Sequence, residues 1–161
     1  MDKYIKLVED LKESFEDFNL YLQDNCKIPL EIVDLESSEN HYLKIGPVPI
    51  EIRFPRSFEY AGVYVYFGYN KENSNELWTY IGKSSNKTMG HRLYNHFLQR
   101  LPKEKLNDQD YYINDGVIIE HLLLFPIKNE ESWFLASSME EFMIINMKDK
   151  GYNLLNKIGN L

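Results

Sequence analysis

Several side chains that can handle a phosphate group recur along the second half of the chain. Tyr64 and Tyr80 each lie in a run of strand-forming residues, so a hairpin would bring their hydroxyls together. Arg92 and His96 are four positions apart, which places them on one face of a helix. Cations gathered beside hydroxyls stabilise the charge that develops on a phosphoryl oxygen. These residues therefore form a candidate phosphate-binding site.

Further candidates flank these four residues. Lys83 and Ser84 follow Gly82, where the backbone can approach a ligand closely. Glu141 lies near the start of a predicted helix, and Asn153 lies just past the end of that helix. We expect the carboxylate to complete the set of cations, phenols and imidazole around a bound phosphate.

The elements that position these residues follow from the hydrophobic pattern. Residues 62–69 and 77–82 are strand-forming runs joined by a turn-forming stretch, and residues 117–126 form a third, buried strand. Residues 89–101 have helical spacing, and a last helix runs from Ser137 or Ser138 to Lys150. We predict an α+β domain over residues 61–161, with helices flanking a small three-stranded antiparallel sheet.

An N-terminal extension over residues 1–60 precedes this domain. It begins with an amphipathic helix over residues 3–23, and three prolines exclude a helix from the extended segment that follows. Residues 50–54 alternate like a half-buried strand. We expect the helix to pack on the body of the same chain, and a monomer or a homodimer both remain open. Its apolar stripe is Tyr4, Val8, Leu11, Phe15, Phe18 and Leu22.

The motif residues resemble a known family of nucleases. Gly62-Val63-Tyr64 and Tyr80-Ile81-Gly82 are similar to the two tripeptides that name the GIY-YIG superfamily. Arg92 and His96 match that family's helix. The resemblance covers residues 62–153, and its last part consists of Glu141, Ile144, Ile145, Tyr152 and Asn153, which fit the family's metal-binding helix and the Tyr-Asn pair after it.

The resemblance implies a metal-dependent endonuclease that hydrolyses phosphodiester bonds in nucleic acid, with DNA expected rather than RNA. Tyr64 would act as general base, helped by neighbours, and Arg92 would clamp the scissile phosphate. Glu141 would hold one divalent ion, Mg²⁺ or Mn²⁺. The resemblance also implies catalytic support from Tyr80 and His96. Beside it, we expect substrate binding by Lys83, Ser84, Arg100 and Asn153.

Simpler explanations exist for the same residues. The tyrosines also fit packed strand aromatics, and Arg92 with His96 also fits a solvated helix face. Capping boxes offer Glu140 and Glu141 a structural role, and we expect Glu140 to cap the helix while Glu141 binds the metal. Fifteen residues separate Tyr64 from Tyr80, so a long hairpin loop is expected. The alternative function is a catalytically inactive GIY-YIG-like module that binds nucleic acid or a protein partner.

Charge and composition limit the partners and the location that we expect for the protein. The net charge is −7, but residues 61–100 hold 5 Lys and Arg against 2 Asp and Glu, which makes them a basic island that can bind phosphate. A single cysteine, Cys26, excludes an internal disulfide framework, and the four histidines lack metal-ligand spacing. No stretch near 18 residues is free of charge. We expect a cytoplasmic protein without a membrane span.

Overall fold

The computed structural model describes residues 3–30, 43–44, 46, 59–86 and 88–156. The strand predicted at residues 50–54 lies outside this part of the chain. No helix in the described part is long and apolar enough to cross a membrane. The α-helices are α1 (Ile5–Leu20), α2 (Met89–Asn95) and α3 (Leu135–Asp149), with single helical turns at Asp24–Cys26 and Glu130–Ser132 and a π-helical segment, His96–Arg100, directly after α2.

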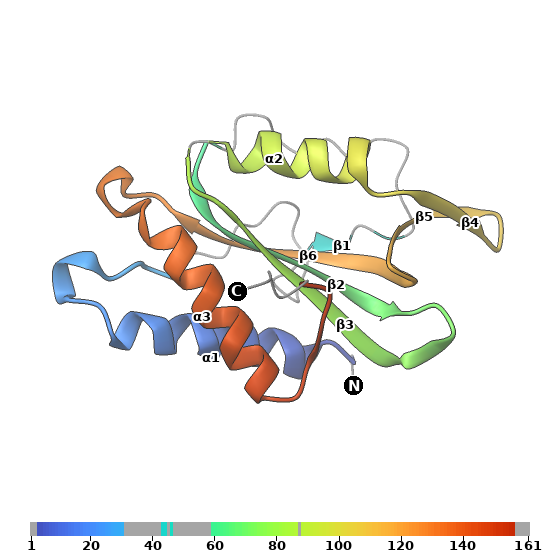
Figure 1. Ribbon diagram of the computed structural model, residues 1–161, viewed down its shortest axis with the longest axis horizontal. Helices are drawn as coiled ribbons and strands as arrows, with labels where there is room; N and C mark the ends of the chain where they lie inside the picture. The colour runs from blue at the N-terminus through green and yellow to red at the C-terminus, as the bar shows by residue number, and fades with distance from the viewer. Residues whose placement is uncertain (1–2, 31–42, 45, 47–58, 87, 157–161) are drawn as a thin grey trace.

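The described strands form one mixed sheet, so the predicted three-stranded antiparallel sheet is wrong (Figure 1). Six strands follow the order β4-β5-β6-β2-β3-β7, and β1 is a seventh that pairs with β6. Every pairing is antiparallel except that of β3 with β7. The strands are β1 (Leu43–Lys44), β2 (Ala61–Asn70), β3 (Asn73–Ser84), β4 (Lys103–Leu106), β5 (Gln109–Asn114), β6 (Val117–Ile127) and β7 (Asn153–Leu154).

The additional strands carry weak sequence signals. β1 and β7 have two residues each, too few for a period to be read. The β4–β5 hairpin is polar and turns at Asn107 and Asp108, which both have positive φ angles (50° and 63°). Asn and Asp tolerate this conformation better than other residues with a side chain, so the pair forms a tight hairpin turn without glycine. The hairpin extends from the end of the sheet in Figure 1.

The β2–β3 hairpin forms the centre of the fold. Asn70 pairs with Asn73, so the connection consists only of Lys71 and Glu72. The prediction of a long loop is therefore wrong, because the additional residues lengthen both strands instead. A register shift between Tyr69 and Asn70 accommodates the additional residues of β3. β2 also pairs along its whole length with β6, and all of its residues from Ala61 to Gly68 are buried.

Helices α1 and α3 cover one face of the sheet (Figure 1). Val63, Val65 and Phe67 project onto this face from β2, because alternate residues of a strand point the same way. They join the apolar stripe of α1 and the methionines of α3 in one buried cluster. Helix α1, which is shorter than the predicted 3–23, and its N-cap residue Tyr4 bury five of the six stripe residues in this cluster.

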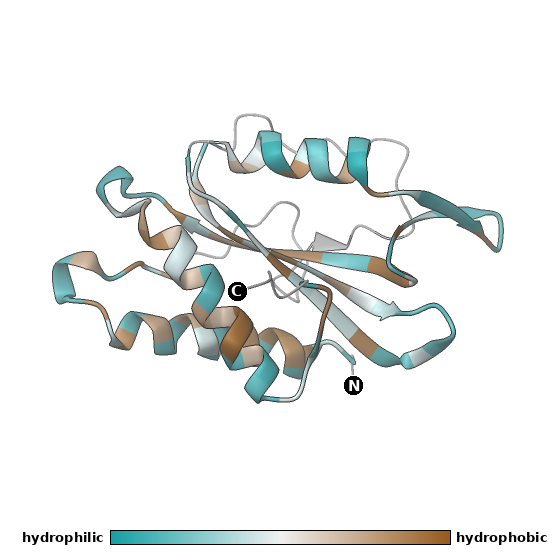
Figure 2. Ribbon diagram, in the orientation of Figure 1, coloured by the Kyte–Doolittle hydropathy of each residue, from teal (hydrophilic) through white to brown (hydrophobic). Residues whose placement is uncertain are grey.

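Helix α2 covers the opposite face. Its buried residues Met89 and Leu93, together with Phe97 of the π-helical segment, pack on Tyr64 and Tyr66 of β2. Figure 2 shows hydrophilic residues along the outer side of α2 and in the β4–β5 hairpin, whereas the central strands carry pale and brown segments with few hydrophilic ones. The two faces of β2 therefore differ in kind, with aliphatic and phenylalanine side chains on one and tyrosines on the other.

Helix α3 begins earlier than the sequence predicts. It starts at Leu135, with Phe134 at the N-cap position and no side-chain cap. Ser137 and Ser138 lie inside the helix, so the predicted capping box does not form, and Glu140 is not a capping residue. The predicted C-terminus is confirmed, because Gly151 follows the helix with φ +85° and accommodates the left-handed turn that ends it.

A polar cluster fastens α1 to the chain that follows α3. The Asp10 carboxylate accepts hydrogen bonds from Lys6, Lys150 and the Tyr152 hydroxyl. Burial acts to raise the pKa of Asp10, but the hydrogen bonds from Lys6 and Tyr152 and the charge of Lys150 outweigh it and lower the pKa. The carboxylate therefore stays ionised and holds the two segments together.

The burial of α1 predicts a large difference between two leucines of this helix. Leu11 is fully buried, whereas Leu20 is 76% exposed. Leu11→Ala should lower the free energy of unfolding by about 3 kcal/mol, because it leaves a cavity between α1 and the sheet, and Leu20→Ala should change it by less than ~0.5 kcal/mol. Urea unfolding followed by circular dichroism measures both. Equal effects would show that α1 does not belong to the core.

Candidate functional site

The register of the β2–β3 hairpin places the two motif tyrosines together. Tyr64 pairs with Gly82, and Tyr66 pairs with Tyr80, so all four residues face α2. The rings of Tyr64 and Tyr80 have centroids 6.3 Å apart, and a hydrogen bond joins their hydroxyls. The structure thus brings the predicted pair of phenols to one place, as the sequence led us to expect.

Two glycines of the motif tripeptides are required by close contacts. A Cβ atom on Gly82 would lie 2.5 Å from Cζ and 2.6 Å from the hydroxyl oxygen of Tyr64. A Cβ atom on Gly62 would lie 2.2 Å from the carbonyl oxygen of Phe125, and Gly62 has φ +140°. Gly82 therefore provides the surface on which the Tyr64 ring lies, and Gly62 lets β2 approach β6 at the start of the strand.

Helix α2 and the segment after it bring Arg92 and His96 to the phenols. Arg92 is exposed, and its side chain hydrogen-bonds to Tyr64. His96 begins the π-helical segment, and its ring stacks on that of Tyr80 at 5.7 Å with an interplanar angle of 26°. The predicted phenol, guanidinium and imidazole groups thus meet on one face of the sheet.

Lys83 and the glutamates of α3 meet at the edge of the sheet. Lys83 Nζ lies 3.2 Å from Oε2 of Glu140, whose side chain is 20% exposed. Glu141 is exposed on the adjacent surface of α3. Charge from Glu140 also acts on Tyr64 and Tyr80. The structure therefore brings Glu140 to the phenols and Lys83, whereas the motif spacing singles out Glu141.

A groove of about 1000 Å³ is lined by Tyr80, Lys83, His96 and the two glutamates, and Tyr64 adjoins it through its hydrogen bond to Tyr80. One wall is the outer surface of α3, where Glu140 and Glu141 are joined by Ile144, Ile145 and Lys148. The opposite wall is the π-helical segment, with His96 and Arg100, and Tyr66 and Tyr80 line the groove between them. Arg100 is exposed there. Cationic, aromatic and apolar side chains thus border one continuous space.

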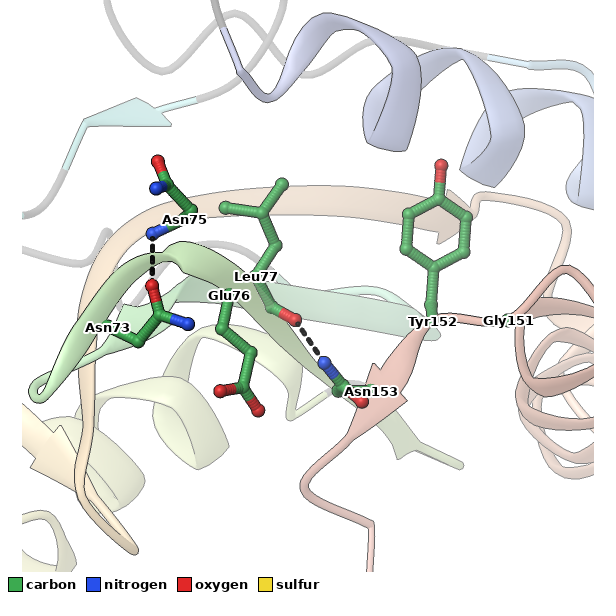
Figure 3. Close-up of a pocket in the computed structure, with 7 residues that line it drawn as sticks. All are labelled: Asn73, Asn75, Glu76, Leu77, Gly151, Tyr152 and Asn153. Atoms are coloured by element: carbon green, nitrogen blue, oxygen red, sulfur yellow. Dashed lines mark hydrogen bonds between the residues drawn. The ribbon is translucent and has the colours of Figure 1, made fainter.

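The structure places two predicted substrate-binding residues away from this groove. Ser84 is buried, and its hydroxyl bonds to the Asn86 carbonyl and to the Thr88 hydroxyl before α2. Asn153 lines a separate, more polar pocket of about 410 Å³, where its amide donates to the Leu77 carbonyl (Figure 3). In this arrangement Ser84 orders the loop between β3 and α2, and Asn153 holds β7 on β3.

Asn156 takes the position at the groove that the motif spacing suggests for Asn153. Its side chain accepts a hydrogen bond from the Ile81 N–H at 2.9 Å and donates one to the Ile81 carbonyl at 2.6 Å. These two bonds fix the backbone of β3 between Tyr80 and Gly82. Asn156 was missed because the motif ends at Asn153, although a second Asn three residues later was a visible candidate.

Tyr66 and Asn114 are the other groups that the motifs do not single out. The Tyr66 ring stacks on Tyr80 at 4.6 Å, its hydroxyl lies 3.2 Å from Nε2 of His96, and the Asn114 amide donates to the same hydroxyl at 2.7 Å. The two-residue period of β2 places Tyr66 on the face of Tyr64, so alternation was a usable signal. Asn114 had none, because its strand was not predicted.

Burial sets the protonation states of the site. Burial raises the pKa of Tyr64 to about 12, Tyr80 adds to the rise, and Arg92 opposes it. Burial and the charge of Glu140 raise the pKa of Tyr80. Burial lowers the pKa of His96, and Arg100 and Arg92 lower it further. At neutral pH both phenols are therefore proton donors, and His96 is a neutral ring that can accept a proton.

The donor set of the groove fits a divalent ion held largely by water and substrate. No three His, Cys, Asp or Glu side chains in the described part of the chain are grouped as a metal site. Mg²⁺ binds through one or two carboxylates and keeps several waters or phosphate oxygens. Glu140, which is partly buried, and Glu141 line the groove and are the glutamates that could hold such an ion.

Comparison of the chain with protein-family models, with curated proteins and with solved structures gives no match. What the site can do is therefore inferred from the positions of its own residues.

The contact between Gly82 and Tyr64 predicts a specific pattern of stability. Gly82→Ala should lower the free energy of unfolding by about 1–3 kcal/mol, because the added methyl group overlaps the Tyr64 ring. In a Tyr64→Ala background the same change should cost less than ~1 kcal/mol, since the ring is gone. Urea unfolding of the four proteins gives the coupling. Equal costs in both backgrounds would contradict the contact.

The buried phenols predict that stability falls in alkaline solution. Folding raises the pKa of Tyr64 from 10.0 to about 12, so the folded state holds this proton more tightly than the unfolded chain. The resulting stability is complete below pH 10 and is lost as the pH rises through 12. Urea midpoints should therefore fall above pH 10, and less steeply for Tyr64→Phe. A midpoint that stays level in this range would be inconsistent with the raised pKa.

Proposed function

We propose that this chain is a metal-dependent endonuclease that hydrolyses phosphodiester bonds in nucleic acid, with DNA as the expected substrate. The observation that carries the proposal is a cluster of polar side chains at one groove. Tyr80, Lys83, His96 and Glu140 line the groove. Tyr64 joins them through its hydrogen bond to Tyr80, and Arg92 in turn hydrogen-bonds to Tyr64. This set supplies the proton transfer and charge stabilisation that phosphodiester hydrolysis needs.

The charge of the site supports a polyanionic substrate. Arg100 is exposed on one wall of the groove, and Lys148 is exposed on the α3 wall. Arg92 is also exposed and hydrogen-bonds to Tyr64. Arginine binds phosphate oxygens through two parallel hydrogen bonds, which positions as well as neutralises the group. We assign Arg92 to the scissile phosphate, because its hydrogen bond to Tyr64 places it beside the reacting groups.

Tyr64 and His96 divide the proton transfer in this proposal. Tyr64 contacts the attacking water, but its raised pKa makes the phenolate scarce at neutral pH. His96 is neutral because burial and two arginines lower its pKa, so it can accept the proton that is released. Tyr80 connects the two, since its hydroxyl bonds to that of Tyr64 and its ring stacks on that of His96.

Glu140 is the carboxylate that we assign to the metal, with Glu141 adjoining it. Glu140 is the partly buried member of the pair and faces Lys83 at 3.2 Å, whereas Glu141 is exposed. A bound Mg²⁺ or Mn²⁺ supplies Lewis-acid stabilisation of the leaving oxygen. Lys83 stands where its ammonium can pair with the phosphate once the carboxylate is engaged. Asn156 orients this end of β3 through the Ile81 backbone.

Cleavage of supercoiled plasmid by the purified protein, with Mg²⁺ or with EDTA, tests the proposal. The wild type should nick or linearise the plasmid only with Mg²⁺. Tyr64→Phe and Glu140→Gln should each lower the rate by about 100-fold or more, because each removes a group that acts on the reacting atoms. Glu141→Gln is the matched control for Glu140, one residue away and exposed, and should lower it by less than ~10-fold.

Two outcomes would change the proposal. A large loss with Glu141→Gln and a small one with Glu140→Gln would reverse the assignment of the metal ligand without touching the reaction. Plasmid, mixed genomic DNA, single strands and RNA that all survive uncut would reject hydrolysis. Retarded migration of the same uncut nucleic acids would then identify a binding module that lacks activity.

A further inference from the structure

The hydroxyl of Tyr66 is buried at the back of the site and contacts two polar groups. Tyr66 is fully buried, and its hydroxyl hydrogen-bonds to Asn114 on β5 and to His96 after α2. The proton-transfer roles proposed above involve the hydroxyls of Tyr64 and Tyr80, and they give no role to Tyr66 or Asn114. The hydroxyl thus connects the β4–β5 hairpin with the imidazole of the proposed site.

The donors and acceptors in this chain have one arrangement that satisfies all three groups. The Asn114 amide nitrogen carries only donors, so it donates to the Tyr66 oxygen at 2.7 Å. The single hydroxyl proton of Tyr66 then points to Nε2 of His96, 3.2 Å away. Nε2 must accept this bond through its lone pair, which leaves the ring proton on Nδ1.

We propose that Asn114 is a positioning residue of the site, which acts through the Tyr66 hydroxyl to hold His96 as the neutral ring protonated on Nδ1. The catalytic consequence rests on the nuclease function proposed above, in which His96 accepts a proton at Nε2, on the lone pair that the Tyr66 hydrogen bond occupies until then. The positioning itself is a property of the fold and does not depend on that function.

The groups around His96 agree with a neutral ring of fixed orientation. Tyr64 and Tyr66 face it from β2, Tyr80 from β3, and Arg92 and Arg100 from the helical segment that carries it. No carboxylate is among the groups that act on its pKa, and both arginines disfavour a second proton. The Tyr66 hydroxyl is therefore the contact that distinguishes the two ring nitrogens.

The backbone around Asn114 explains why this residue can act at a distance from its own hairpin. Asn114 is the last residue of β5 and pairs with Val117 of β6 across a two-residue turn. That turn consists of Asp115 and Gly116, with φ angles of 48° and 80°. Such a tight turn leaves little freedom at its ends, so the amide is held over the Tyr66 hydroxyl. The β4–β5 hairpin thereby contributes one side chain to the groove.

Long-range ¹H–¹⁵N correlation spectra of the His96 ring test the proposal in the full chain. Such spectra distinguish the two neutral forms of histidine, and His96→Gln identifies the signals. The wild type should carry its proton on Nδ1. In Asn114→Asp the carboxylate accepts the Tyr66 hydroxyl proton, so the Tyr66 oxygen must accept from His96, and the ring proton should move to Nε2. The nearby charge should also raise the pKa of His96 by about one unit.

Two control variants isolate the effect. Asn107→Asp introduces the same charge in the same hairpin, at an exposed turn residue, and should leave the His96 ring unchanged. In Tyr66→Phe the connection is absent, so adding Asn114→Asp should not move the ring proton. A wild-type proton on Nε2, or an unchanged ring in Asn114→Asp, would overturn the proposal. Asn114→Ala, which introduces no charge, should give a mixture of both neutral forms.

Cleavage kinetics separate the failure of this inference from the failure of the nuclease function. If the plasmid is cut, Asn114→Asp should lower kcat by about tenfold with little change in KM, since the proton acceptor is altered and the phosphate contacts are not. If nothing is cut while the ring proton still moves as expected, the positioning stands and the nuclease function fails. If the plasmid is cut but the ring proton of His96 does not move in Asn114→Asp, the nuclease function stands and the positioning fails.

Discussion

The phenol of Tyr64 lies directly on the backbone of Gly82, so closely that one added methyl group would come within 2.5 Å of the ring. This contact requires the register in which Tyr64 opposes Gly82 and Tyr66 opposes Tyr80. A shift by one residue would send every tyrosine to the other face of the sheet and bring aliphatic residues under α2. The position of each phenol, and of the His96 ring stacked on Tyr80, depends on this register.

The division of β2 into two faces lets one strand serve both stability and chemistry. On the side of α1 and α3, Val63, Val65 and Phe67 fill an apolar core. On the side of α2, the tyrosines bury their rings and keep their hydroxyls in a polar network. A phenol suits this position because its ring contributes apolar burial while its hydroxyl finds a partner. The same burial makes these hydroxyls weak acids, which leaves His96 as the neutral proton acceptor.

The elements outside the central hairpin supply the rest of the groove. α3 contributes Glu140 because the helix buries Met139 and Met143 on the sheet, which turns Glu140, next to Met139, toward Lys83. The end of α3 is held by Lys150 and Tyr152, which hydrogen-bond to Asp10 of α1. Asn156, four residues after Tyr152, hydrogen-bonds to Ile81 of β3. The N-terminal helix thus contributes indirectly, because it fastens the segment that fixes the backbone of the second tripeptide.

The sequence by itself determined the elements with a clear period: the amphipathic N-terminal helix, the paired strands, the buried third strand and the two helices around it. It also paired Tyr64 with Tyr80 through the hairpin and Arg92 with His96 through the helical period, and the motif resemblance predicted that the two pairs share one site. The packing of α2 on the tyrosine face of the sheet is a tertiary contact that local period does not determine. The polar β4–β5 hairpin and the two-residue strands carried no period and were not predictable. Only the tertiary structure decided that Glu140 rather than Glu141 faces Lys83, and that Asn156 and Asn114 reach the groove. Those outcomes depend on where a helix begins and how distant segments pack, which no local pattern encodes.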